Sequence, residues 1–310
     1  MNYLLLSQIV IGILFIKFYK YLPVLIKINN KKVYSGGFFF VISLINYYIF
    51  SYLFSEINFE LVLFPLLAFF IGALDDKLNI SPLLRLFLIS IIVFILININ
   101  SEYNVNFLNL DGKIFKIDSP YDIIFTCLCF LLLLNSINFS DGINCLSGLI
   151  FLFYFTYLGV KFDQNIILLL IIIISLIFFL YMNWKNKCYL GDGGVYLLSF
   201  LISQLIILNY KSSYNFFHVE EILLLLYLPG YDLLRLFISR IFDKKNPFKG
   251  DKNHIHHLLV KKLGLLKTLI IFMVCLMTPI FLLSLLKLNY LICIILSILI
   301  YVSLINYAKN

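Results

Sequence analysis

The chain has 310 residues, of which 62% are hydrophobic and only 13% are charged. Soluble domains average roughly 45–50% apolar and about 25% charged residues, so this composition excludes a water-soluble globular protein and indicates a lipid environment. The net charge of +8 would favour a nucleic-acid partner in a soluble protein, but in a membrane protein it is better explained by basic cytoplasmic loops, and we expect no nucleic-acid partner.

Eleven apolar stretches follow one another along the chain, and most approach the roughly 20 residues that cross a bilayer. They cover residues 3–22, 37–54, 61–74, 82–100, 121–137, 146–160, 165–182, 193–210, 219–238, 264–284 and 289–307. No soluble domain of useful size fits between them. We therefore predict an all-α polytopic membrane protein of about 10–11 transmembrane helices, with residues 1–310 forming a single integral-membrane domain.

The distribution of Lys and Arg predicts the orientation. Loops that follow odd-numbered stretches hold 14 of the 24 basic residues, and loops that follow even-numbered stretches hold 5. Cytoplasmic loops are enriched in basic residues. The N-terminus is therefore expected outside the cytoplasm and the C-terminus inside it.

One loop on the less basic side carries a strand signal. Residues 103–118 alternate polar and apolar side chains around Asp111-Gly112. Asp-Gly flanked by alternating residues favours a tight hairpin turn. We predict a small periplasmic β-hairpin here.

The unusual polar motifs all fall on the basic side, which favours an enzyme site at a cytoplasmic cleft over a transporter path through the middle of the helices. The first is Asp75-Asp76 with Arg85 downstream. Adjacent carboxylates raise each other's pKa unless a cation offsets them, so a divalent metal, a basic neighbour or a proton-transfer role would each explain the pair. A solvated loop before a helix that begins at Ser81-Pro82 is the alternative.

The second motif joins amides and a carboxylate at a helix end. Its members are Asn135, Asn138, Asp141 and Asn144. Asn135 and Asn138 are three residues apart and can share one helix face. They offer hydrogen bonds to a base, a ribose or a phosphate, or they simply form a polar connection between two helices.

The third and fourth motifs are a glycine turn and a histidine cluster. Asp192 lies within Gly191-Asp192-Gly193-Gly194, where a lone carboxylate suits Mg²⁺ and a helix cap is the alternative. The long loop after Arg240 holds His254, His256 and His257. These imidazoles suit phosphate binding or proton transfer better than zinc, because no second half of a zinc site accompanies them.

These four motifs, in this order, resemble the polyprenyl-phosphate N-acetylhexosamine-1-phosphate transferases of glycosyltransferase family 4, in particular the branch specific for undecaprenyl phosphate and N-acetylglucosamine 1-phosphate. The ending Asp251-x-x-His254-x-His256-His257 carries much of the likeness. The resemblance implies transfer of a sugar 1-phosphate from a UDP-sugar to undecaprenyl or another polyprenyl phosphate, with release of UMP, in the bacterial inner membrane. It also implies Mg²⁺, or Mn²⁺ in its place. We leave open whether two copies form a homodimer.

The resemblance also implies roles for individual residues. Asp192 and Asp76 would be metal ligands, and Asp75 and Asp76 would include the group that activates the lipid phosphate. The catalytic set would be completed by His254, His256 and His257. The expected substrate-binding residues are Lys32, Arg85, Asn135, Asn138, Asp141, Asn144 and Arg240.

Three departures from the family pattern leave the sugar undefined. Only Gly36-Gly37 remains of a Pro-Thr-Pro-Gly-Gly loop, Asn144 replaces the second Asp of an Asp-Gly-x-Asp-Gly run, and Val195 replaces a Ser after the glycine turn. Two other classes stay as alternatives. An intramembrane prenyltransferase would carry a second Asp-rich motif, and a transporter of lipid-linked sugar would carry more charge within its spans.

Overall fold

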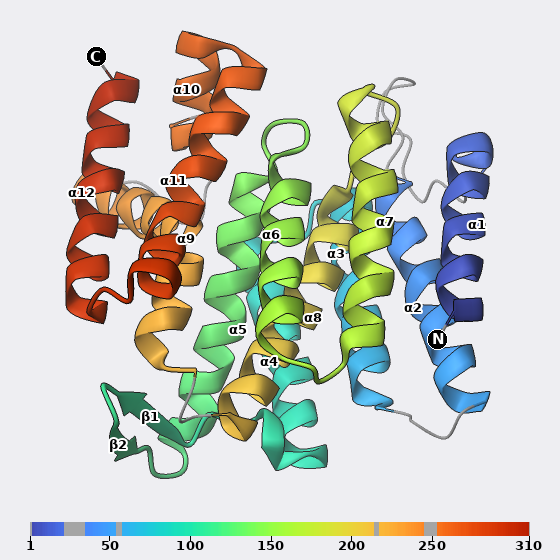
Figure 1. The fold of residues 1–310 in the computed structure, drawn as a ribbon, viewed down its shortest axis with the longest axis horizontal. Coiled ribbons are helices and arrows are strands. Elements are labelled where there is room, and N and C mark those ends of the chain that lie inside the picture. Colours follow the sequence, from blue (N-terminus) through green and yellow to red (C-terminus); the bar gives the residue numbers. More distant parts are fainter. Residues whose placement is uncertain (1, 22–34, 54–57, 214–216, 245–252, 310) are drawn as a thin grey trace. The chain divides into compact units, whose positions relative to one another are not determined.

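A computed structural model describes residues 2–21, 35–53, 58–213, 217–244 and 253–309. Helices dominate these residues, and one short hairpin interrupts them (Figure 1). The elements are α1 (Asn2–Phe18), α2 (Gly36–Leu53), α3 (Glu60–Leu78), α4 (Pro82–Ile99), a 3₁₀ turn (Ser101–Tyr103), β1 (Phe107–Leu110), β2 (Lys113–Lys116), α5 (Tyr121–Ser140), α6 (Leu146–Lys161), α7 (Ile166–Trp184), α8 (Gly191–Ser212), α9 (Val219–Phe242), α10 (Ile255–Leu263), α11 (Leu265–Leu286) and α12 (Tyr290–Lys309).

The helices confirm a polytopic all-α membrane protein. Within the described residues, 8 helices are long and apolar enough to cross a membrane, and α1 and α6 are shorter apolar helices. The remaining long helix, α3, carries Asp75, Asp76 and Lys77 in its last turn. Each of the eleven predicted stretches corresponds to one of these helices, with bounds that differ by a few residues.

The chain divides into two compact units, each built from two segments. The first unit comprises Met1–Asn104 and Ser147–Asn209, and the second comprises Val105–Leu146 and Tyr210–Asn310. The first contains α1–α4, α6, α7 and most of α8, and the second contains the hairpin, α5 and α9–α12. That the two units together form a single integral-membrane domain stays a prediction.

Buried side-chain hydrogen bonds join three helices of the first unit. The amide of Gln8 in α1 donates to the hydroxyl groups of Ser43 in α2 and Ser175 in α7, at 2.9 and 2.8 Å. All three side chains are fully buried. Where lipid surrounds the helices, burial of apolar surface from water cannot drive helix association, so small residues and interhelical hydrogen bonds take a larger share.

The turn between α3 and α4 follows from local sequence. Asn79 adopts a left-handed conformation with φ 49° and its N–H donates to the carbonyl of Asp75, which ends α3. Ser81 caps α4 by accepting from the N–H of Leu84 at 3.4 Å, and Pro82 occupies the first turn. This short turn brings the last residues of α3 beside the first residues of α4.

Glycine allows α3 and α8 to approach each other within the first unit. A Cβ atom placed on Gly72 would lie 2.4 Å from the backbone oxygen of Asp192 and 2.6 Å from the backbone nitrogen of Gly193. Neither backbone atom can rotate away as a flexible side chain could. The contact between the end of α3 and the start of α8 therefore requires glycine at position 72.

The predicted β-hairpin is confirmed in the second unit. β1 and β2 pair antiparallel with Leu110 opposite Lys113, and Asp111-Gly112 form the two-residue turn. Both turn residues have positive φ, 47° and 80°, which a type I′ turn requires. The phenol of Tyr210 accepts from the N–H of Asn109 at 2.7 Å and donates to the carbonyl of Phe107, which fixes the hairpin to the end of α8.

The histidine segment is not the loop that the sequence predicted. His254 is the residue before α10, and His256 and His257 lie in the first turn of this nine-residue helix. Ile255 and Leu259 are both fully buried and lie one turn apart, so a short apolar face holds the helix in place. The helix orients the imidazoles, which an extended loop would not do.

We expect Gly72→Ala to destabilise the protein. Helix propensity favours Ala over Gly by about 1 kcal/mol, but overpacking against an immovable backbone costs about 1–3 kcal/mol. The melting temperature in detergent, followed by gel filtration, should fall. Gly159→Ala in α6 is the matched control, since its Cβ would lie 3.7 Å from the nearest side-chain atoms. A melting temperature for Gly72→Ala at or above that of the control would contradict the close approach.

Candidate active site

The first and third motifs meet in the first unit. Arg85 at the start of α4 donates to the carboxylate of Asp75, and its guanidinium lies 3.7 Å from the carboxylate of Asp192. Asp75 is buried with 5% exposure, whereas Asp192 keeps 32% of its side chain exposed. Arg85 therefore offsets the charge of two carboxylates that come from different helices.

Asp76 has a different set of partners from Asp75. Its two carboxylate oxygens accept from the backbone N–H of Asp192 at 3.1 Å and of Gly193 at 3.2 Å. These N–H groups belong to the first turn of α8, where no intrahelical acceptor is available and the helix dipole favours a negative charge. Asp76 thus caps α8 from a neighbouring helix and fixes the position of Asp192.

Asp75, Asp76 and Asp192 offer carboxylate oxygens to Mg²⁺ but do not surround an ion completely. Carboxylate oxygens are the ligands that Mg²⁺ prefers, and it is usually held by one or two carboxylates together with substrate phosphates. Among the described residues, no three His, Cys, Asp or Glu side chains are arranged to hold a metal ion by themselves. Asp192 and Asp76 offer carboxylate oxygens of the kind that Mg²⁺ prefers, and their role as metal ligands stays a prediction.

The second and fourth motifs meet in the second unit. α5 ends at Ser140, and Asp141 and Gly142 form the turn that follows. A Cβ atom on Gly142 would lie 2.4 Å from Nε2 of His256 and 2.6 Å from Nε2 of His257. Both imidazoles therefore pack directly on this turn, and a side chain at position 142 would have to displace them.

The imidazoles form a cluster of contacting rings at the start of α10, in which His254 and His256 are stacked. The ring of His254 lies 5.2 Å from that of Phe139 and 5.6 Å from that of His256, and His256 lies 4.3 Å from His257. His256 is 1% exposed, and its Nε2 has no hydrogen-bond partner among the described residues. A buried polar atom without a partner is uncommon and marks a position where a ligand atom could bind.

Burial also controls the charge of His256. Loss of hydration, followed by repulsion from the imidazoles of His257 and His254, lowers the pKa of His256 from 6.5 to about 3, although Asp232 acts in the opposite direction. The ring is neutral at physiological pH. It can bind a ligand through a hydrogen bond but not through a positive charge.

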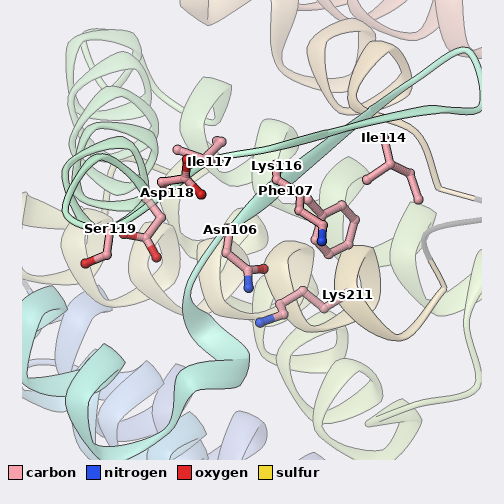
Figure 2. Close-up of a pocket in the computed structure, with 9 residues that line it drawn as sticks. Asn106, Phe107, Ile114, Lys116, Ile117, Asp118, Ser119 and Lys211 are labelled. Carbon is pink, nitrogen blue, oxygen red and sulfur yellow. The ribbon is translucent and has the colours of Figure 1, made fainter.

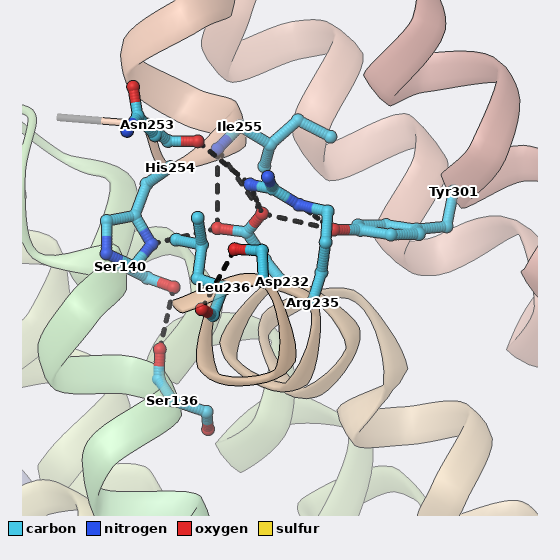
Figure 3. Close-up of polar contacts among 10 residues, drawn as sticks. Ser136, Ser140, Asp232, Arg235, Leu236, Asn253, His254, Ile255 and Tyr301 are labelled. Carbon is cyan, nitrogen blue, oxygen red and sulfur yellow. Dashed lines mark hydrogen bonds and ion pairs between the residues drawn. The ribbon is translucent and has the colours of Figure 1, made fainter. Parts of the chain in front are cut away.

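Asp232 organises the start of α10, as Figure 3 shows. Its carboxylate lies 2.9 Å from Nδ1 of His254 and accepts from the N–H of Ile255, from Arg235 at 2.8 Å and from the phenol of Tyr301 at 3.2 Å. Because an ionised carboxylate can only accept, Nδ1 of His254 carries the shared proton. The network joins α9, α10 and α12, and it leaves Nε2 of His254 as the other reactive nitrogen.

The other predicted residues lie near these groups or outside the described residues. Asn135 donates to the carbonyl of Leu131 in its own helix at 2.6 Å, and Asn138 follows one turn later in α5. Arg240 is buried near the end of α9. Asn144 lies in the turn after α5, beyond Asp141. Lys32 lies outside the described residues. The predicted roles of all these residues stay predictions, as does a cleft that would join the two groups.

The sequence motifs assigned no role to Asp232, Arg235 or Tyr301. A signal was present, since Asp and Arg three residues apart inside an otherwise apolar helix are costly in lipid unless they pair or act. Nothing in the sequence connected them with His254 or with Tyr301, which is 69 residues beyond Asp232.

We expect Asp232→Asn to loosen the start of α10. The change removes the charge that Arg235 and Nδ1 of His254 share, and weakening the partners of buried groups costs at least about 1 kcal/mol. The melting temperature in detergent should fall. Asp111→Asn removes the same charge in the hairpin turn, where Asn tolerates positive φ, and should leave the melting temperature unchanged. Equal effects of the two substitutions would contradict the organising role of Asp232.

The lowered pKa of His256 predicts a pH effect on stability. As pH falls below 6.5, the unfolded chain binds a proton at this residue that the folded protein does not bind until about pH 3. The folded state therefore loses about 1.4 kcal/mol per pH unit from this group. Between pH 7.5 and pH 5, the free energy of unfolding of wild type should fall by about 2 kcal/mol more than that of His256→Gln. Parallel unfolding curves for the two proteins at both pH values would contradict a buried neutral imidazole.

Comparison with known proteins finds one matching family and several relatives. Residues 58–210 match the family model described as glycosyl transferase family 4. The chain is 26% identical over 210 residues to the undecaprenyl-phosphate alpha-N-acetylglucosaminyl 1-phosphate transferase of Thermotoga maritima, covering 67% of this chain and 64% of that protein. It is 29% identical over 199 residues to a probable undecaprenyl-phosphate N-acetylglucosaminyl 1-phosphate transferase of Bacillus subtilis, covering 61% and 54%.

A third relative is the undecaprenyl-phosphate alpha-N-acetylglucosaminyl 1-phosphate transferase of Yersinia pestis, at 23% identity over 202 residues. The alignments with the Yersinia and Bacillus proteins span just over half the length of those relatives. The matched residues 58–210 include Asp75, Asp76 and Asp192 and the amide-rich turn after α5, whereas the histidine cluster lies beyond them. This match covers just under half of the chain, and it is to the family that the sequence motifs resemble.

Proposed function

We propose that this protein transfers a sugar 1-phosphate from a UDP-sugar to undecaprenyl or another polyprenyl phosphate and releases UMP. The observation that carries the proposal is that the first motif meets the third and the second motif meets the fourth. Asp75, Asp76 and Asp192 gather around Arg85, and the amide-rich turn packs on the histidines. The names of the relatives support the same substrate classes. An N-acetylhexosamine is the proposed sugar.

The reaction brings three phosphate groups together, so catalysis depends mainly on positioning and on offsetting negative charge. A phosphate oxygen of the lipid attacks the sugar-linked phosphorus of the UDP-sugar, and the bond from that phosphorus to UMP breaks. Mg²⁺, bound by Asp192 and Asp76, would stabilise the negative charge of the diphosphate. Arg85 offsets the charge of the surrounding carboxylates.

The two adjacent aspartates would have different roles, one at the metal and one at the lipid phosphate. Asp76 is committed to α8, beside Asp192, and is therefore the one that shares the metal site. Asp75 faces Arg85 and is the proposed group that positions and activates the phosphate of the lipid. A lipid phosphate is already ionised near pH 7, so orientation matters more than proton removal.

The second group would hold the nucleotide-sugar. Nε2 of His256 and of His257 lie against the turn at Gly142, beside Asp141. A neutral imidazole there can donate a hydrogen bond to a phosphate or sugar oxygen. Asn138 and Asn144 are the proposed contacts to the base, ribose or sugar. Arg240 is the proposed phosphate contact on the side of α9.

The proposed location is the bacterial inner membrane, with the N-terminus in the periplasm and the C-terminus and active site in the cytoplasm. The 14-to-5 distribution of basic residues supports this orientation. It would give cytosolic UDP-sugar access to the site and let the polyprenyl chain enter from the lipid. The product would serve a cell-surface glycan.

The test is an assay with purified protein, undecaprenyl phosphate and a panel of UDP-sugars labelled in the sugar. Label should move into the lipid extract together with stoichiometric UMP. EDTA should abolish transfer, and Mg²⁺ or Mn²⁺ should restore it. Asp192→Asn should lower the rate at least about a hundredfold, because metal charge stabilisation contributes several kcal/mol.

Asp163→Asn is the matched control, since it removes the same charge from an exposed position between α6 and α7. Its rate should equal that of wild type. Undiminished transfer in excess EDTA would overturn the metal proposal. Asp232 and Arg235 inside α9 would also suit a transporter of lipid-linked sugar. Movement of labelled lipid across proteoliposomes without UMP release would favour that function instead.

A further inference from the structure

A pocket of about 450 Å³ lies beside the hairpin in the second unit (Figure 2). It is distant from the histidine group, because that group lies at the C-terminal end of α5 and the pocket at its N-terminal end. α5 has 20 residues, which corresponds to about 30 Å. The pocket therefore belongs to neither polar group described above, and no role has been given to it.

Its lining combines two positive side chains with two carboxylates. Lys116 comes from β2 and Lys211 from the last turn of α8, and Asp118 comes from the connection to α5. Figure 2 shows the two lysines on one side of the pocket, Asp118 with Ser119 on the other, and Asn106 between them. A second carboxylate, Asp122, is 8% exposed and accepts from the N–H of Ile123 at 2.8 Å, so it serves the start of α5.

The walls of the pocket are held in place by hydrogen bonds. The N–H of Ile117 donates to the carbonyl of Asn106 at 2.9 Å, which closes the base of the hairpin. The ring of Phe107 stacks on that of Tyr210 at 5.3 Å. The pocket thus exists before any ligand binds, which lowers the entropic cost of binding.

The pocket lies at the level where membrane spans end. α5 and α8 are both long and apolar enough to cross a membrane, and the pocket residues Ser119 and Lys211 lie at their ends. Phospholipid headgroups occupy this level of a bilayer, and Lys side chains there meet lipid phosphates. Ile114, which is 53% exposed, adds an apolar wall beside Lys116.

We propose that this pocket binds the headgroup of a phospholipid that carries both a phosphate and a primary ammonium group, as phosphatidylethanolamine does. The phosphate lies between Lys116 and Lys211, and the ammonium lies at Asp118. Two lysines alone would suit any anionic lipid, and the opposed carboxylate adds the selection for an amine. The proposal requires only that the chain spans a membrane and does not rest on the proposed transferase activity.

The test measures lipid binding to delipidated protein in detergent by native mass spectrometry. Phosphatidylethanolamine should bind wild type more tightly than phosphatidylglycerol, which has the phosphate but no amine. Lys116→Ala and Lys211→Ala should each weaken phosphatidylethanolamine binding about tenfold. Asp118→Asn should weaken binding of phosphatidylethanolamine but not of phosphatidylglycerol.

Lys113→Ala is the matched control, because Lys113 lies on the same strand but does not line the pocket. It should change the dissociation constant less than twofold, and each variant's melting temperature should be checked beside wild type. If Lys113→Ala and Lys116→Ala lowered the lipid affinity equally, the lipid would be held by diffuse charge attraction, and binding in the pocket would be overturned. Equal binding of both lipids to wild type would overturn selection for the amine. Glycerophosphoethanolamine, which lacks acyl chains, should bind far more weakly; equal affinity would overturn a lipid ligand.

Discussion

In each of the two units, one carboxylate fixes the start of a helix other than its own by accepting hydrogen bonds from that helix's first N–H groups. Asp76 on α3 accepts from the start of α8, and Asp232 on α9 accepts from the start of α10. The first N–H groups of a helix have no partner inside it and need an acceptor from elsewhere. A carboxylate supplies the missing acceptor and a charge that the helix dipole favours. Both helices are therefore fixed at the residues that carry their reactive side chains.

Glycine makes the same arrangement sterically feasible. Gly72 lets the backbone of α3 touch that of α8, and Gly142 lets two imidazoles rest on the turn after α5. A Cβ at either position would lie within 2.6 Å of another atom. In membrane proteins close approach of this kind replaces part of the driving force that burial of apolar surface from water gives to soluble proteins. These two glycines of the motifs therefore serve packing.

The features that the sequence predicted correctly are those that neighbouring residues encode. Apolar length predicts the helices, and Asp111-Gly112 predicts the hairpin turn because only certain residues tolerate positive φ there. The contact of Asp76 with Asp192 joins residues 116 positions apart, and no local pattern encodes such a distance. α10 was missed for another reason. It has nine residues and begins with histidines, so it is too short for a clear helical period. The buried pair Ile255 and Leu259 was the one helical signal within it.

The geometry of a helix explains why two adjacent aspartates are useful at the end of α3. Consecutive residues of a helix project about 100° apart, so Asp75 and Asp76 reach different groups. Asp75 contacts Arg85 of α4 and the side chain of Asp192, whereas Asp76 accepts from the backbone of the first turn of α8. Asp192 begins that turn and lies 3.7 Å from the same arginine. Two consecutive side chains thus link three helices, and the carboxylate of Asp192 is left partly exposed where these helices meet. Exposure there is what a residue needs if it is to bind a metal ion that arrives with its substrate.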